Sequence, residues 1–362
     1  MWFDRFIFKQ QEMKWKDYLI IGCGLAGISF AETALHAGKS ITVINNNSQN
    51  SSRIAGGMYN PVVLKRFTAI WNAKDQLEYA SSFYEDLHLK LKIKFDYKLP
   101  LLRKFYSVEE QNNWFIASDK QDLAPFLSTN LLPTKWDFIP ATYSFGEVLQ
   151  CGYLNTALLL ESYIDYLKKN NIYTNATFNH ESLIINEDGI IYENTQYQHI
   201  VFAEGFGMLS NPFFKNLPMD GTKGELLIIK APLLQLDVII KSGVFIVPIG
   251  NDLYKVGATY NWNDKTDLPT DEGKSELLDG LQDLITCPFE VVEHRAGVRP
   301  TVKDRRPLVG THPLYSRLHI LNGMGTRGVM LAPSMARDLF QSIEHGTLLD
   351  KNIDIKRIKN FV

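Results

Sequence analysis

Cysteine is scarce in this sequence and never occurs in closely spaced pairs. The three cysteines, Cys23, Cys151 and Cys287, lie far apart and form no C-x-x-C motif. This spacing argues against a redox dithiol and against a structural zinc site, which both use cysteines close in sequence. We therefore expect no metal ion. So few cysteines are also typical of a reducing compartment, and we expect a cytoplasmic protein.

The chain also lacks long apolar runs and a large net charge. No stretch approaches the roughly 20 apolar residues that a membrane-spanning helix needs, so we expect no membrane partner. The net charge of −2 provides no general attraction to nucleic acid. A local basic run occurs at Lys303, Arg305 and Arg306, and we interpret it as a solvated turn in preference to a binding patch. At 362 residues, the chain suits two interleaved domains.

The N-terminus lacks the apolar core and cleavage site of a signal peptide. A glycine-fingerprint strand normally begins within a few residues of the chain start, but here residues 1–16 precede it. We interpret residues 1–16 as an N-terminal extension. Residues 1–12 of it are either an added segment or the product of an upstream start codon, and we expect function not to depend on them.

A β-α-β unit is predicted at the start of the folded part. Residues 17–21 form an apolar run typical of a buried strand, residues 28–37 have helical spacing, and residues 40–44 form a second strand. A G-x-G-x-x-G string lies between the first strand and the helix, which is the context that dinucleotide binding requires. Its glycines are Gly22, Gly24 and Gly27.

This glycine string predicts a site for a pyrophosphate. Its glycines make the tight turn, admit the phosphates and allow close helix packing, while free N–H groups at Leu25 and Ala26 bind the phosphates. The second strand ends at Asn45, where an acidic residue usually binds the adenosine ribose. An amide can also bond a ribose hydroxyl, and no arginine follows to hold a 2′-phosphate. The loop by itself leaves FAD and NAD open.

The remaining pattern predicts an α/β (α+β) two-domain fold. Further helices are expected at residues 72–90, 153–170 and 329–345. Further strands are expected at residues 172–179, 182–186, 189–193, 199–203, 224–230, 243–248, 253–259 and 318–322. We assign residues 17–75, 146–222 and 295–362 to a discontinuous Rossmann-like domain that binds the cofactor. Residues 76–145 and 223–294 are assigned to an inserted domain with an antiparallel sheet that binds the substrate.

A second glycine cluster follows the strand at residues 318–322. It contains Gly323, Gly325, Thr326, Gly328 and Val329. The cluster is either a second dinucleotide site or a further part of the first one. Because only a terminal helix and tail follow it, we favour the second reading, with one FAD and no NAD. The N-terminus of the helix would then stabilise the reduced flavin at its N1–C2=O edge.

Several strings in order resemble the D-amino-acid oxidase-like family of FAD oxidoreductases, from about residue 17 to residue 362. After the first glycine loop, residues 54–61 (IAGGMYNP) resemble the flavin loop of the family, and residues 203–205 (AEG) match its A-x-G string. Residues 221–225 (GTKGE) resemble its R-G-Q turn, residues 244–248 and 256–259 its two substrate-sheet strands, and residues 296–310 its RP…D..P segment. The resemblance implies that further cofactor contacts come from Ala55, Gly56, Gly57, Met58, Ala203 and Gly205.

Two subgroups of the family are most similar to this chain. The segment 295–300 (RAGVRP) resembles glycine oxidase. The segment 323–333 and the loop 57–61 resemble the oxidase domain of the bifunctional enzyme that modifies the tRNA wobble uridine. The methyltransferase partner domain of that enzyme is absent here, and the sequence has no obvious basic surface.

The resemblance also implies roles in substrate binding and catalysis. Arg299 matches the arginine that holds the substrate carboxylate, a task that suits the planar guanidinium. Arg327 either binds the carboxylate too or ties down the flavin loop. Phe245 stands where the family often has a tyrosine, which puts plain glycine-oxidase specificity in doubt. Tyr59 and Tyr260 are the candidates to supply the missing hydroxyl, but core packing is the stronger explanation of both.

The expected reaction is hydride transfer from the carbon beside an amine to flavin N5 of a noncovalently bound FAD. The resulting imine would hydrolyse, and oxygen or another carrier would reoxidise the flavin. A small amino acid or secondary amine is the favoured substrate. One alternative is the carboxymethylaminomethyl group of a tRNA wobble uridine, which the near-neutral charge disfavours. The other is a non-catalytic flavoprotein.

Overall fold

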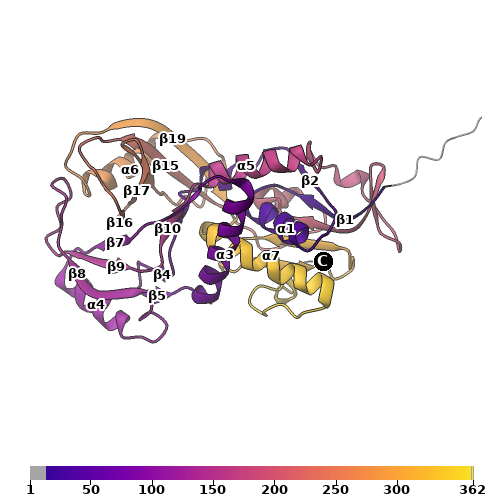
Figure 1. Ribbon diagram of the computed structural model, residues 1–362, viewed down its shortest axis with the longest axis horizontal. Coiled ribbons are helices and arrows are strands. Elements are labelled where there is room, and N and C mark those ends of the chain that lie inside the picture. Colours follow the sequence, from indigo (N-terminus) through magenta and orange to yellow (C-terminus); the bar gives the residue numbers. More distant parts are fainter. Residues whose placement is uncertain (1–13, 360, 362) are drawn as a thin grey trace, which may run out of the picture.

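The computed structural model describes residues 14–359 and residue 361, and two large sheets lie side by side along its long axis (Figure 1). Helices α1, α3, α5 and α7 gather around one sheet, whereas α4 and α6 accompany the other. The helices are α1 (Leu25–His36), α2 (Ser51–Ile54), α3 (Ala73–Leu91), α4 (Val108–Ser118), α5 (Thr156–Lys169), α6 (Asp271–Gln282) and α7 (Gly328–His345). Short 3-10 turns are η1 (His180–Ser182), η2 (Gly205–Ser210), η3 (Gly325–Arg327) and η4 (Ile355–Arg357).

The first sheet is built around a parallel centre. Its order is β11-β2-β1-β14-β13-β12, and β21 also pairs with β14 and with β20. The pairs β2–β1, β1–β14 and β14–β21 are parallel, so their carboxyl ends meet at one edge. The strands are β1 (Lys14–Ile21), β2 (Ile41–Asn45), β11 (Tyr173–Asn175), β12 (Ile184–Ile185), β13 (Ile190–Tyr192), β14 (Thr195–Phe202), β20 (Leu308–Thr311) and β21 (Leu318–Asn322).

The second sheet is antiparallel except for the pair β16–β7. Its order is β19-β15-β18-β17-β16-β7-β9-β8. The strands are β7 (Leu101–Lys104), β8 (Leu127–Leu132), β9 (Phe145–Val148), β15 (Thr222–Lys230), β16 (Ile239–Lys241), β17 (Phe245–Gly250), β18 (Leu253–Gly257) and β19 (Glu290–Arg299). Smaller pairings join β3 (Met58–Tyr59), β10 (Gly152–Leu154) and β6 (Asp96–Lys98), and join β4 (Val62–Val63) to β5 (Thr68–Ala69).

The predicted α/β class with an antiparallel second sheet is confirmed, but helices α4 and α6 and strand β19 were not predicted, and some predicted elements differ at their ends. The first strand begins at Lys14, not at residue 17, because Lys14, Trp15 and Lys16 pair in parallel with β14. Part of the expected extension is therefore strand, and residues 1–13 lie outside the described residues. The four expected long helices appear at α1, α3, α5 and α7 within a few residues of their predicted ends.

The two sheets share one apolar core. A single cluster of buried side chains contains Tyr18 of the first sheet together with Leu101 and Val247 of the second. The expected domain boundary at residues 294/295 falls inside the continuous strand β19. The division into two domains with those boundaries stays a prediction.

Candidate cofactor and substrate site

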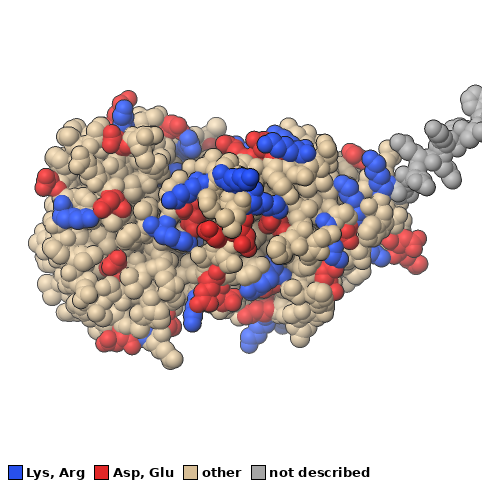
Figure 2. Space-filling view, viewed as in Figure 1, with Lys and Arg blue, Asp and Glu red and all other residues tan. Residues whose placement is uncertain are grey.

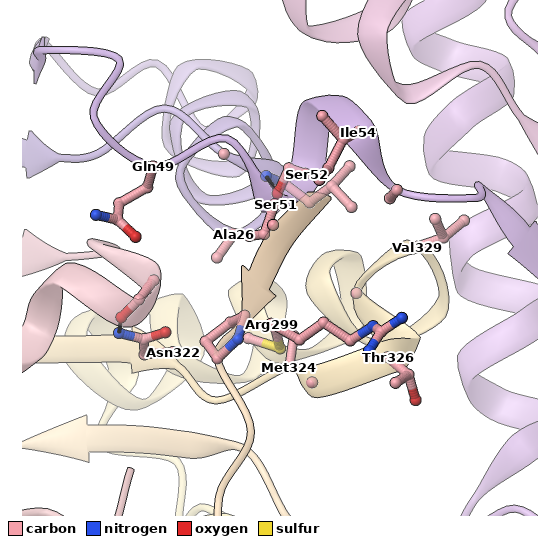
Figure 3. A pocket seen from close by; sticks show the side chains of 18 of the residues that line it. Ala26, Gln49, Ser51, Ser52, Ile54, Arg299, Asn322, Met324, Thr326 and Val329 are labelled. Carbon is pink, nitrogen blue, oxygen red and sulfur yellow. Dashed lines mark hydrogen bonds between the residues drawn. The ribbon is translucent and has the colours of Figure 1, made fainter. Parts of the chain in front are cut away.

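A cavity of about 620 Å³ lies where the carboxyl ends of β1, β2, β14 and β21 face the second sheet. Figure 3 shows its lining, with Ser52 and Ile54 on one side and Arg299, Met324 and Thr326 on the other. In open sheets of this kind, ligands bind outside the carboxyl ends of parallel strands. The cavity therefore occupies the place that the first glycine string predicts.

Close packing explains the glycines of the first loop. Gly22 has φ +98°, and a Cβ there would lie 2.3 Å from the carbonyl oxygen of Ala203. A Cβ on Gly27 would lie 2.1 Å from the carbonyl oxygen of Gly22. Only glycine fits at either position without moving backbone. Gly27 thus packs the helix onto the loop and does not line the cavity, while Gly22 and Gly24 do.

The N-terminus of α1 opens into this cavity as a binding site for anions. Its first turn has no acidic residue, and Gly24 at the N-cap provides no side-chain cap. The N–H of Leu25 donates to the Ser52 hydroxyl at 3.2 Å, and Ala26 also lines the cavity. Backbone N–H groups and the helix dipole together favour a phosphate at this position.

Asn45 lies at the end of β2 as predicted, and its amide is already engaged. Its Oδ1 accepts from the N–H of Cys23 at 3.3 Å, and its Nδ2 donates to Asn47 Oδ1 at 2.9 Å and to the Tyr173 hydroxyl at 3.3 Å. Asn45 therefore ties β2 to the glycine loop. Burial raises the pKa of Cys23 to about 12, so this cavity-lining thiol stays protonated near neutral pH.

The loop after α2 forms part of the cavity wall, between the N-terminus of α1 and the second sheet. Residues Ala55, Gly56, Gly57 and Met58 line the cavity. The ring of Phe245 packs on Gly56, where a Cβ would come within 2.7 Å of its Cζ atom. Gly57 has φ +77° and leaves no room for a Cβ beside the carbonyl oxygen of Leu154. Phe245 thus shapes the cavity and supplies no hydroxyl.

Asn322 joins two of the predicted glycine segments. It ends β21, and its Nδ2 donates to the carbonyl oxygen of Gly205 at 2.9 Å while its Oδ1 accepts from the N–H of Gly323 at 2.8 Å. Ala203, Gly205, Gly325, Thr326, Gly328 and Val329 all line the cavity, and Gly323 instead packs on Val302 and Leu308. Helix α7 begins at Gly328, so its positive end points into the same space.

Arg299 is half-buried at the end of β19 and lines the cavity. Its guanidinium donates to the carbonyl oxygen of Thr259 at 3.2 Å from both Nη atoms, and to that of Lys223 at 3.3 Å. Among the described residues, no carboxylate lies within ion-pair distance of it. Burial lowers its pKa from the usual value, but an arginine remains charged at physiological pH. The site thus presents a cation that lacks an anion.

Arg327 is a second cation on the same cavity, and within residues 14–359 it too has no carboxylate partner. Burial and the neighbouring Arg305 and Arg306 lower its pKa. The Tyr260 ring lies 4.5 Å from the Arg299 guanidinium and is 59% exposed, so it covers one side of the arginine at the cavity mouth.

Tyr59 lines the cavity, but its hydroxyl donates to Asp96 Oδ1 at 2.8 Å. Burial and the Asp96 carboxylate raise its pKa well above the usual value. Of the two tyrosines that we considered as substitutes for the missing hydroxyl, Tyr59 is thus engaged elsewhere. Tyr260 is the one beside Arg299.

Sequence reasoning missed several lining residues. Gln49 precedes helix α2 and Ser52 lies in it, both within the polar stretch that follows β2. The length of this stretch was the only sequence signal that it could reach the cavity. Lys241, at the end of β16, also lines the cavity. Burial, with a smaller effect of Arg103, lowers its pKa to about 8. No motif marked Lys241, because only the sheet order brings β16 to this cavity.

Comparison with known proteins agrees with this geometry. A family model described as FAD dependent oxidoreductase (DAO) matches residues 17–341. The chain belongs to this family. It is therefore an FAD-dependent oxidoreductase, and the cavity fits FAD: it combines the close-packed glycines of the first loop, a helix N-terminus whose N–H groups suit a pyrophosphate, and the loop 55–58 beside the second sheet.

Similar proteins of the DAO family include two curated relatives. The tRNA 5-methylaminomethyl-2-thiouridine biosynthesis bifunctional protein of Marinobacter nauticus is 23% identical over 358 residues, covering 90% of this chain and 55% of that protein. Glycine oxidase of Bacillus subtilis is 26% identical over 211 residues, covering 53% of this chain and 56% of that protein. The matches thus span little more than half the length of either relative.

Solved structures show the same fold. Glycine oxidase from Geobacillus kaustophilus superposes with a TM-score of 0.74 at 18% identity, covering 93% of this chain and 97% of that chain. Iminodiacetate oxidase from Chelativorans sp. BNC1 gives 0.75 at 17% identity, covering 93% and 98%. Within the part of this chain that the structure describes, no helix is long and apolar enough to cross a membrane.

Proposed function

We propose that this DAO-family enzyme oxidises the C–N bond of a small amino acid or secondary amine, and that Arg299 binds the substrate carboxylate. The observation that carries the proposal is the half-buried guanidinium of Arg299, which faces the cavity and has only carbonyl oxygens as partners. A carboxylate would supply the missing counter-charge through two parallel hydrogen bonds. The names of the similar oxidases, which include glycine and iminodiacetate, support the same substrate class.

Orientation is the main contribution that we assign to the protein. When bound in this cavity, FAD would supply the two-electron acceptor for a hydride from the carbon beside the amine. Arg299 holds the carboxylate in one plane, and Phe245 limits where the rest of a small substrate lies. No dedicated base is required if the amine binds in its neutral form, and the imine product hydrolyses in water to an oxo acid and ammonia or an amine. Oxygen or another carrier then takes up the electrons.

The cofactor is proposed to be bound without a covalent bond. Cys23 is the thiol that lines the cavity, and its pKa of about 12 keeps it un-ionised and therefore weakly nucleophilic. Arg327, at the end of η3 on the same cavity, is proposed to assist Arg299 or to fix residues 323–328. Unfolding the enzyme in acid should release all of its FAD.

The test compares each substrate with its neutral counterpart. Glycine, sarcosine and D-amino acids are assayed for amine or ammonia release beside the corresponding carboxamides. The carboxylates should react, and Arg299→Ala should lower kcat/KM for them by about 100-fold, because a buried charge pair is broken. Arg317→Ala is the matched control, since Arg317 binds Gln198 and Glu187 carbonyls away from the cavity. Equal rates for acid and amide would refute the role of Arg299.

A second candidate is oxidation of the carboxymethylaminomethyl group of a tRNA wobble uridine. The bifunctional tRNA-modifying relative matches 90% of this chain, and such a substrate carries the same carboxylate and secondary amine. Tyr260 and Trp262, 59% and 41% exposed, offer stacking surfaces beside the mouth. Against it, positive and negative side chains alternate on the face in Figure 2. Modified tRNA that stays unchanged with active enzyme would exclude this candidate.

A further inference from the structure

Lys223 is an unusual residue because its side chain is entirely buried although it carries a charge. It lies in β15, next to the strand that ends at Arg299. Its Nζ atom donates to Asp264 Oδ2 and to the carbonyl oxygen of Leu268, and to Thr266 Oγ1 at 3.3 Å. A buried charge is stable only where such partners surround it. The buried ammonium of Lys223 is therefore stable only while these groups stay in place.

All three partners belong to the segment 259–270, which runs from β18 to α6. The backbone of Lys223 also pairs with this segment, since its N–H donates to the Asn261 carbonyl at 2.9 Å and its carbonyl accepts from the Asn261 N–H at 3.0 Å. Glu225, two residues along β15, accepts from the N–H and hydroxyl of Thr270 at 2.9 and 2.8 Å. The segment is thus attached to β15 at both ends and in its middle.

The same segment holds the arginine of the proposed substrate site. Thr259 supplies the carbonyl oxygen that accepts from both Nη atoms of Arg299, and the next residue, Tyr260, places its ring 4.5 Å from the guanidinium. On its other side, Arg299 lies across Gly224, where a Cβ would come within 1.8 Å of Nη2. The direction in which the guanidinium points therefore depends on where the segment 259–270 lies.

We propose that Lys223 is a positioning residue for substrate binding: it anchors the segment 259–270, and this segment orients the Arg299 guanidinium toward the substrate carboxylate. The inference rests on the proposed function of Arg299. Lys223 itself does not line the cavity; its carbonyl oxygen accepts from Arg299 Nη1 at 3.3 Å, while its Nζ atom donates to the segment 259–270. It acts through the segment, so its loss should weaken binding of a carboxylate without displacing FAD.

Binding of glycolate to the FAD-loaded enzyme, measured from the change in flavin absorption, tests both the carboxylate site at Arg299 and the positioning role of Lys223. Lys223→Met should weaken binding about tenfold, the effect of misplacing one charged hydrogen bond. Lys135→Met is the matched control, because Lys135 forms an exposed ion pair with Asp237. The double variant Lys223→Met/Arg299→Ala should bind no more weakly than Arg299→Ala, because the two residues act in series.

Asp264→Asn separates positioning from simple electrostatics and avoids a change in the core. The hydrogen bond from Lys223 lowers the pKa of Asp264 to about 2, so the carboxylate is charged at all working pH values. Removing this negative charge should strengthen anion binding if only net charge matters. Positioning predicts the opposite sign, a loss of about threefold, because Lys223 loses its charged partner in the segment and keeps only Glu225 of its own strand, with Oε1 at 3.6 Å from Nζ.

The outcomes distinguish the two proposals. If Arg299→Ala leaves glycolate binding unchanged, the carboxylate site is wrong and the role of Lys223 is wrong with it. If Arg299→Ala weakens binding but Lys223→Met and Asp264→Asn do not, only the positioning role is overturned. Loss of FAD or a large fall in Tm in both Lys223→Met and Asp264→Asn, in step with the weaker binding, would instead indicate a general packing role and would also overturn it.

Discussion

At the scale of single residues, the site combines glycines, whose missing side chains allow close packing around the cavity, with two arginines that have no carboxylate partner among the described residues. The glycines were visible as a string, but their separate tasks were not. Gly22 and Gly24 line the cavity, whereas Gly27 joins helix to loop. Arg299 and Arg327 line the same cavity, although they lie 28 positions apart in sequence.

Gly27→Ala should greatly reduce FAD retention while leaving the second sheet intact. The added methyl group would meet the carbonyl oxygen of Gly22 at 2.1 Å, so the glycine loop must move away from the phosphate position. The ratio of flavin to protein absorption in the purified variant measures the effect. Gly243→Ala serves as the control, since its nearest neighbour, the Tyr106 hydroxyl, is 3.8 Å away. Full flavin content in Gly27→Ala would contradict the proposal that the glycine loop binds the pyrophosphate of FAD.

At the scale of elements, sequence patterns predicted those parts of the fold that are locally encoded. Strand β1, helix α1 and strand β2 follow from an apolar run, a glycine string and helical spacing, and helix α7 follows from spacing and Gly346. Strands β7, β8 and β9 fall in the stretch 95–145, whose topology the pattern did not resolve. Strand β7 pairs with β16, β9 with β7 and β8 with β9, and the β7–β16 pairing is non-local, so no local signal marks it.

The same limit applies to the site. Strings resembling a family located most of the lining residues, because each string is short and contiguous. Lys241, Ser52 and the anchor Lys223 were missed because their importance depends on which strands and loops meet in space. The assignment of Tyr59 to the substrate remains a prediction, and its bond to Asp96 argues for a structural task.

Strands β14 and β21 contain a buried histidine pair that makes stability depend on pH. His199 Nδ1 and His319 Nε2 lie 3.0 Å apart, and burial lowers the pKa of His199 to about 4 and that of His319 well below its usual value. The folded protein keeps both rings neutral, whereas the unfolded chain gains protons below pH 6.5. Stability should therefore fall as the pH drops from 6.5 toward 4, and be unaffected above 6.5.

Urea unfolding at several pH values measures this effect. His199 alone should contribute a loss on the order of 3 kcal/mol in the free energy of unfolding by pH 4, from a shift in its pKa of about 2.5. His199→Asn keeps a polar partner for His319 without titrating, so its stability should decline less steeply between pH 6.5 and 4. Parallel pH profiles for the two proteins would show that His199 does not contribute.

At the scale of the whole molecule, the cofactor cavity lies between two sheets that share one apolar core. Because the proposed FAD contacts come from both sheets, bound FAD would stabilise both sheets together against unfolding. After FAD removal, each tenfold increase in free FAD above its Kd should raise the free energy of unfolding by about 1.4 kcal/mol. Thermal unfolding followed by circular dichroism checks this, with NAD as the control ligand. An equal response to NAD would contradict the assignment of a single FAD site.

The most direct test of amine oxidation is an anaerobic absorption spectrum of the purified holoenzyme, recorded before and after addition of glycine, sarcosine and D-amino acids. The account predicts that the oxidised flavin band bleaches in the wild-type enzyme. It also predicts that Arg299→Ala requires far more substrate for the same bleaching, while Arg317→Ala behaves as wild type. A flavin band that stays oxidised with every carboxylate amine, in an enzyme that dithionite still reduces, would contradict the account.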